Sequence, residues 1–139
     1  MRNVLADGVF DLLHANHAAF LEQARGFGDR LVVAVLSDRR VREYKRWPVL
    51  REQERLAVVR ALRCVDEAFV LDDPLTGATM ERLIRVHGIS AVVYGGTGFS
   101  DYYGPAEAAG IMRRLPYRGG INSSQIIERI VDRRLNGDL

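Results

Sequence analysis

The stretch 31-LVVAVLS-37 is a continuous apolar run that is rich in β-branched residues. It lacks the apolar–polar alternation of a half-buried strand, so it predicts a central strand covered on both faces, as in a parallel sheet. A shorter apolar run, 2-RNVLA-6, ends at Asp7-Gly8 and predicts a second buried strand followed by a loop. From Ala15 to Phe27 apolar residues recur at helical spacing, and glycines end the segment. This part of the chain therefore predicts a strand–helix–strand unit.

The alternation of helix and strand continues to the end of the chain. We expect helices at 51–65, 78–88, 103–113 and 123–135, and strands at 67–71, 90–94 and 114–117. Short connections between such elements predict right-handed crossovers. The expected fold is therefore α/β: a Rossmann-like, doubly wound parallel sheet of five strands, in a single domain that spans residues 1–139.

Composition narrows the class of protein. With 47% hydrophobic residues, the 139-residue chain can bury a sizeable core. The formal charge of +2 comes from scattered arginines, which disfavours nucleic acid and suggests anionic small molecules as ligands. We find no apolar stretch long enough for a membrane helix and no signal peptide, so we expect a cytoplasmic protein without membrane contact. Cys64 is the only cysteine, so it forms no intrachain disulfide, and we expect it to be buried.

The stretch 7-DGVFDLLHANHAAF-20 follows the first expected strand and holds two of the three histidines. Ligands of doubly wound sheets bind outside the carboxyl ends of the strands. A helix that begins near Ala15 presents free N–H groups and a positive dipole end there, which favours an anion. His14 and His17 are three residues apart, so both can face one ligand.

Other interpretations of the two histidines remain open. They are compatible with a buried pair of core residues or with acid–base groups, although we see no serine or cysteine nucleophile nearby. Zinc needs about three protein ligands, and the remaining candidates, His87 and Cys64, lie far along the chain. Phosphate contact by both imidazoles is the interpretation that we favour.

Three separated motifs also carry a family resemblance. The segment 6-ADGVFDLLHANH-17 resembles the signature of the CTP-dependent cytidylyltransferases that act on phosphocholine, phosphoethanolamine and glycerol 3-phosphate, whose hallmark is H-x-G-H. The stretches 45-KRWPVLREQERLAVVRALRCVDEAF-69 and 115-LPYRGGINSSQIIERI-130 resemble the later motifs of the same family, in the same order. The resemblance covers most of the chain. It implies the α/β nucleotidyltransferase fold, transfer of CMP from CTP to a small phosphorylated or phosphonylated alcohol, and release of pyrophosphate.

The resemblance also implies roles for particular residues. His14 and His17 match the histidines that hold the nucleotide phosphates, and Lys45 matches the lysine that reaches the α-phosphate and the acceptor phosphate; these three are the expected catalytic residues. The expected nucleotide-binding residues are Gly8, Phe10, Asn16, Arg55, Gly95, Arg118, Gly120, Ile121, Ser123 and Ser124, and the expected acceptor-binding residues are Asp11, Asp101 and Tyr102. We expect Mg²⁺ to arrive with CTP, no metal site made by the protein alone, and a homodimer.

The chain departs from the family pattern at three places. Asn16 stands where the signature has glycine, so we expect it to narrow the pocket or gain a hydrogen-bond partner, and Asn16→Gly to raise CTP affinity. In 117-YRGGINSS-124, Tyr117 takes the place of the family's arginine, and Arg118 is the candidate to replace it. The stretch 94-YGGTGF-99 lacks the family's acidic residues at Gly95, Gly96 and Thr97.

Two other functions remain open. An ATP-dependent adenylyltransferase acting on a sugar phosphate or similar acceptor shares the H-x-G-H signature and a glycine-rich loop like Tyr94 to Gly98. A non-catalytic nucleotide-binding homologue is the second alternative, because each of the three motifs carries a substitution and fold alone does not establish activity.

Overall fold

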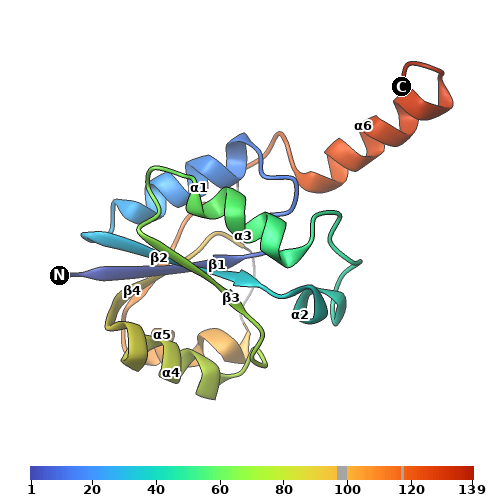
Figure 1. The fold of residues 1–139 in the computed structure, drawn as a ribbon. Coiled ribbons are helices and arrows are strands. Elements are labelled where there is room, and N and C mark those ends of the chain that lie inside the picture. The colour runs from blue at the N-terminus through green and yellow to red at the C-terminus, as the bar shows by residue number, and fades with distance from the viewer. Residues whose placement is uncertain (97–99, 117) are drawn as a thin grey trace.

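A computed structural model of the chain describes residues 1–96, 100–116 and 118–139. Its centre is a parallel sheet of five strands in the order β3-β2-β1-β4-β5 (Figure 1). The strands are β1 (Asn3–Gly8), β2 (Arg30–Leu36), β3 (Glu67–Leu71), β4 (Ile89–Tyr94) and β5 (Met112–Arg114). The chain builds outward from β1 through β2 to β3 and then crosses to β4, so the strand order reverses between β1 and β4. This arrangement confirms the predicted doubly wound α/β fold.

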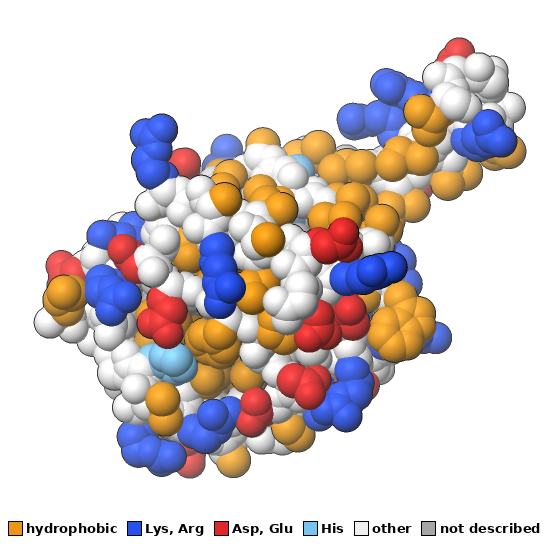
Figure 2. Space-filling model, in the orientation of Figure 1, with side chains coloured by type: hydrophobic (Ala, Val, Ile, Leu, Met, Phe, Trp, Pro, Cys, Tyr) orange, Lys and Arg blue, Asp and Glu red, His pale blue; other side chains and the backbone are white. Residues whose placement is uncertain are grey.

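Helices cover both faces of the sheet. Figure 1 shows α1 (Ala15–Arg25) and α3 (Glu52–Arg60) on one face, and α4 (Gly77–His87) and α5 (Gly104–Ala108) on the other. A short helix, α2 (Asp38–Arg42), follows β2, and a 3-10 turn, η1 (Asp101–Tyr103), precedes α5. The last helix, α6 (Ser123–Leu135), projects from the body and has no fully buried residue. Hydrophobic and basic side chains share its surface in Figure 2. The expected homodimer stays a prediction.

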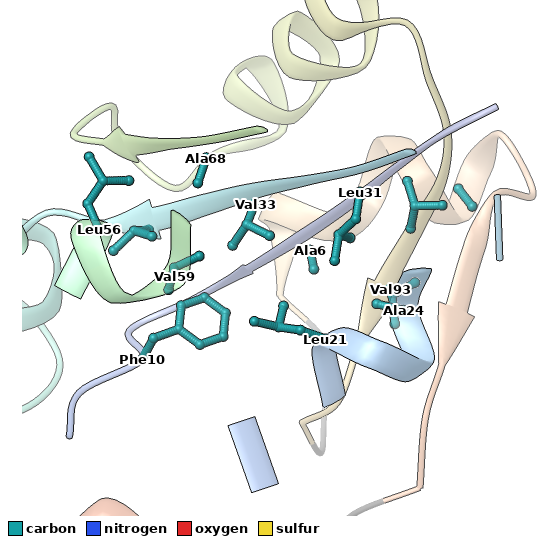
Figure 3. Close-up of a cluster of buried hydrophobic side chains, with 13 residues drawn as sticks. Ala6, Phe10, Leu21, Ala24, Leu31, Val33, Leu56, Val59, Ala68 and Val93 are labelled. Carbon is teal, nitrogen blue, oxygen red and sulfur yellow. The ribbon is translucent and has the colours of Figure 1, made fainter. Parts of the chain in front are cut away.

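Two apolar clusters form the core, one on each face of the sheet. On the first face Val33 packs with Leu21 of α1 and Val59 of α3 (Figure 3). On the second face Val32 packs with Leu83 of α4. Neighbouring residues of β2 thus point to opposite faces, and both are buried. This explains why the sequence of β2 is a continuous apolar run.

Several expected boundaries were wrong. The helix expected at 51–65 ends at Arg60, where the N–H groups of Ala61 and Leu62 bond to carbonyls three residues back, and the chain turns toward β3. Cys64 lies in this turn and is half-buried, not buried. The helix expected at 103–113 is reduced to α5, and α2 was not expected.

The last strand also lies earlier than expected. It runs over Met112–Arg114, although the pattern predicted 114–117, and Tyr117 lies outside the described residues. Proline has no N–H to donate, so Pro116 cannot continue a ladder. None of the helices in the described part of the chain is both long and apolar enough to cross a membrane.

Candidate active site

A cleft of about 990 Å³ opens beyond the carboxyl ends of β1 and β4, where the strand order reverses. This is the position at which doubly wound sheets bind ligands. The cleft is lined by these expected site residues: Gly8, Phe10, Asp11, His14, Asn16, His17, Lys45, Gly95, Tyr102, Arg118, Ile121, Ser123 and Ser124. Segments far apart in the sequence therefore meet at one site. Thr97, one of the positions that lack the family's acidic residue, lies outside the described residues.

His14 and His17 lie against each other at the beginning of α1. Their rings stack with centroids 3.8 Å apart and planes inclined by 24°. His14 caps the helix, since its Nδ1 accepts the N–H of Asn16 at 3.2 Å, and Nδ1 of His17 accepts the N–H of His14 at 3.2 Å. A ring nitrogen that accepts an N–H carries no proton, so each neutral ring carries its proton on Nε2. Both rings are thereby set to donate from Nε2.

Both imidazoles are neutral near pH 7. Burial lowers the pKa of His14 below its ordinary value. Burial, together with the neighbouring His14 and Lys45, lowers the pKa of His17 to about 4, against the opposite effect of Asp11. The free protein therefore offers two uncharged N–H donors beside the cation of Lys45.

We expect a phosphate ligand to bind with uptake of a proton at about pH 5.5. This pH lies between the pKa of about 4 for His17 in the free protein and the ordinary histidine value of 6.5. A nearby polyanion stabilises imidazolium and raises this pKa, so affinity should rise as the pH falls through this window. Calorimetric titration in buffers of different ionisation heat measures the uptake. His17→Asn should lose most of it, and equal uptake by this variant would assign the proton elsewhere.

The Phe10 ring packs against the His17 ring. It lies edge-on to His17, with centroids 5.7 Å apart, and belongs to the buried cluster on that face. A Cβ on Gly8 would lie 3.0 Å from Cζ of Phe10, so any larger residue there would require the Phe10 ring to shift by a few tenths of an ångström. Phe10 and Leu12 both have a left-handed backbone, with φ of 55° and 50°. Such conformations persist only where surrounding contacts hold them.

Asp11 supplies those contacts. Its carboxylate accepts the N–H groups of Val49 and Leu50 at 2.8 and 2.9 Å and Nη1 of Arg46 at 3.1 Å. Burial alone would raise its pKa, but these donors outweigh burial and lower the pKa. Its main-chain oxygen accepts the Ser123 hydroxyl at 2.5 Å. The expectation that Asp11 binds the acceptor is therefore corrected: its carboxylate joins the loop at 46–50 to the histidine loop.

Arg55 does not line the cleft, although we expected it to bind nucleotide. Its side chain is 0% exposed. Nε donates to the Leu50 carbonyl at 3.0 Å, Nη1 to the Val9 carbonyl at 2.7 Å, and Nη2 to the Asp38 carboxylate at 2.8 Å. Arg55 thus holds the main chain on either side of the cleft and cannot itself reach a ligand.

Two further expected residues also lie off the cleft. Asp101 is exposed in the first turn of η1 and does not line the cavity. Gly120 has a left-handed backbone with φ of 92° and shapes the segment before α6 without lining the cavity. Lys45 does line it, and its Nζ lies 5.7 Å from the centroid of the Tyr44 ring.

Asp7, which the sequence did not identify as a site residue, lies beside Tyr103. Both line the cleft, and the Tyr103 hydroxyl donates to Asp7 at 2.7 Å. The pKa of Asp7 is raised to about 6, because burial outweighs the lowering effect of the nearby Tyr103 and Tyr102 hydroxyls. Within the described residues, Oδ2 of Asp7 and the Tyr102 hydroxyl are buried without a hydrogen-bond partner. The sequence could have identified Asp7 by its place as a carboxylate at the carboxyl end of an apolar strand. Ligands of doubly wound sheets bind at that end of the strands.

The described residues contain no group of three or more histidine, cysteine, aspartate or glutamate side chains placed to hold a metal ion. The two carboxylates of the cleft are also poor ligands here, since Asp11 is fully engaged and Asp7 is buried beside tyrosines. Mg²⁺ commonly keeps several waters and binds through substrate phosphates. The donor set therefore fits a metal carried by a nucleotide, not one held by a protein cage.

Comparison with known proteins assigns the family. The model of the cytidylyltransferase-like family matches residues 5–129, which contain the histidines, Lys45 and the beginning of α6. The chain belongs to the cytidylyltransferase-like family. The match includes every strand of the sheet apart from the first residues of β1.

The proteins similar to this cytidylyltransferase-like chain include two with different names. It is 40% identical over 134 residues to the bifunctional protein HldE of Koribacter versatilis, covering 92% of this chain and 27% of that protein. It is 37% identical over 139 residues to the ethanolamine-phosphate cytidylyltransferase of Dictyostelium discoideum, covering 95% of this chain and 38% of that protein. The chain thus spans well under half the length of both relatives.

A solved structure shares the fold. The lipopolysaccharide core biosynthesis protein of Thermoplasma volcanium superimposes with a TM-score of 0.68 at 29% identity, over 88% of this chain and 99% of that one. The agreement extends over nearly the whole of that protein.

Proposed function

We propose that this chain transfers CMP from CTP to a small phosphorylated or phosphonylated alcohol and releases pyrophosphate. The observation that carries the proposal is the pair of stacked histidines, both set to donate from Nε2, on the same cleft as Lys45. Nearly all of the catalysis of phosphoryl transfer comes from positioning and charge stabilisation. The cleft offers donors and a cation of that kind.

The proposed reaction is a single displacement. An oxygen of the acceptor phosphate attacks the α-phosphorus of CTP, a new P–O bond forms, and the bond to the β-phosphate oxygen breaks as pyrophosphate leaves. Negative charge then shifts onto the α-phosphate oxygens and the leaving group. His14 and His17 donate to these oxygens, and Lys45 places its cation beside them. No covalent intermediate with the protein is needed.

The beginning of α6 is a second phosphate-binding element in this proposal. Asn122 caps the helix by accepting the N–H of Gln125 at 2.8 Å, and the Ser123 hydroxyl is engaged with Asp11. Ser124 lines the cleft, and its hydroxyl bonds to none of the described residues, so it can donate to a phosphate. A helix of 13 residues also directs its positive dipole end here. Bound with the nucleotide, Mg²⁺ would neutralise charge on the triphosphate.

The floor of the cleft supports an acceptor that carries an ammonium group. Among the described residues, Oδ2 of Asp7 is buried without a hydrogen-bond partner, although the Tyr102 hydroxyl lies near enough to lower the pKa of Asp7. A buried polar atom without a partner is costly unless a ligand supplies one. The rings of Tyr102 and Tyr103 lie edge-to-face beside Asp7, 4.9 Å apart. Aromatic faces together with a carboxylate bind ammonium groups well. Among the acceptors proposed, phosphoethanolamine and phosphocholine fit this floor better than glycerol 3-phosphate.

An ATP-dependent adenylyltransferase is the second candidate. Gly95 and Gly96 line the cleft, as expected for the glycine-rich loop of such enzymes. The identity to HldE, 40%, is close to the 37% identity to an ethanolamine-phosphate cytidylyltransferase, so sequence similarity does not separate the two candidates.

We expect pyrophosphate release with CTP and Mg²⁺, not with ATP, and fastest with an amino alcohol phosphate. The test combines each nucleotide with phosphoethanolamine, phosphocholine, glycerol 3-phosphate and a small phosphonate. Lys45→Ala supplies the background rate. Release with ATP alone would identify an adenylyltransferase. No release from any combination, with CTP still bound in a thermal-shift assay, would identify a binding protein.

A further inference from the structure

Asn16 lies between the two histidines, and its side-chain amide faces the segment that leads into α6. Its Nδ2 donates to the carbonyls of Gly119 at 2.9 Å and Ile121 at 2.8 Å, and lies 3.5 Å from that of Arg118. All three partners are acceptors. The orientation of the amide is therefore determined, since the reversed orientation would place Oδ1 against carbonyl oxygens.

The segment 118–121 has little else to hold it. Arg118, Gly119 and Gly120 are exposed, and Gly120 has a φ of 92°. Across the described residues, we find no other hydrogen bond that joins the main chain of this segment to the body. Two consecutive glycines lose much backbone freedom when they are ordered. The Asn16 amide is thus the main polar contact that orders them.

We propose that Asn16 is a positioning residue that orders the segment 118–121 over the cleft before any nucleotide binds. A second link runs parallel to it, from the Ser123 hydroxyl to the Asp11 carbonyl. Together the two links join the histidine segment to the beginning of α6. In the proposed function these are the two phosphate-binding elements, so the catalytic consequence rests on that function. The ordering itself is a property of the free protein.

The expected effect of Asn16→Gly changes sign as a result. A side chain that crowded the nucleotide would make the glycine variant bind more tightly. The amide is instead directed at the carbonyls of Gly119 and Ile121. A preorganised segment spares the ligand the entropy of ordering it, so removing the amide should weaken binding.

The first test needs no ligand. In Asn16→Ala and Asn16→Asp, we expect the NMR order parameters of the Gly119 and Gly120 amides to fall from about 0.85 to below about 0.6. Asn16→Asp keeps the size of the side chain but replaces the donor with an acceptor. Gly88, which caps α4, serves as an unaffected internal reference. Asn136→Asp, the same change at the far end of α6, is the matched control. Unchanged order at Gly119 and Gly120 would overturn the proposal.

The second test is kinetic. We expect the KM for CTP of Asn16→Ala to rise about tenfold, the loss of one or two hydrogen bonds, with kcat within about twofold. A purely structural loss would lower the fraction of active enzyme and reduce kcat instead. Loosened glycines with an unchanged KM would overturn the catalytic consequence. Loosened glycines in a protein that releases no pyrophosphate, wild type included, would support the ordering role and overturn the proposed function.

Discussion

Replacing His17 with asparagine is expected to lower kcat about 10²- to 10³-fold, the loss typical of one preorganised donor to developing charge. Asparagine can accept the N–H of His14 as Nδ1 of His17 does, so the helix cap should survive. It has no donor at the position of Nε2. The loss should therefore come from the missing donor and not from a disturbed helix. Steady-state release of pyrophosphate measures kcat, and thermal unfolding checks the fold.

His17→Gln is the matched comparison for this prediction. Its longer amide can place a donor near the position of Nε2, and in that rotamer the amide oxygen is turned away from the N–H of His14. We expect it to retain more activity than His17→Asn while being the less stable of the two. The reverse order of activity would mean that His17 serves the cap alone.

The alternation of elements was predictable because buried parallel strands and amphipathic helices carry local signals. The run around Val33 is apolar on both faces since two helical layers cover it. Boundaries were less accurate. The stretch after Arg60 consists of good helix formers, yet the chain must turn there to bring Glu67 into register with Val32. Tertiary packing, which no local pattern records, decided where that helix ended.

The sequence predicted the location of the candidate site more accurately than it predicted the roles of the individual residues. His14, His17 and Lys45 were identified by motif and do line the cleft. A motif does not distinguish a residue that touches a ligand from one that holds a loop. Asp11 was expected at the acceptor but is used by main-chain donors from distant residues. Asp7 was overlooked because its importance comes from Tyr103, which lies 96 residues away in sequence.

Arg55→Met is expected to destabilise the fold by about 3–5 kcal/mol, the usual cost of breaking a buried ion pair by removing one partner. Methionine keeps much of the volume, but the carbonyls of Val9 and Leu50 and Oδ1 of Asp38 lose the donor that Arg55 supplies. Urea unfolding measures the change. Arg60→Met is the matched control on the same helix, since Arg60 is exposed and, among the described residues, bonds only to the Ala68 carbonyl. It should cost about 1 kcal/mol or less.

Arg55 also links stability to activity. Its three acceptors lie in the histidine loop, in the loop that carries Lys45, and at the beginning of α2. Arg55→Lys keeps the charge but has one nitrogen in place of a planar fork, so it should restore only part of the stability. Asp38→Leu added to Arg55→Met should recover stability relative to Arg55→Met alone, because it removes a carboxylate that has lost its guanidinium partner. Additive losses in this double variant would show that the Arg55–Asp38 contact is not energetically coupled. The buried arginine would then act only through the carbonyls of Val9 and Leu50.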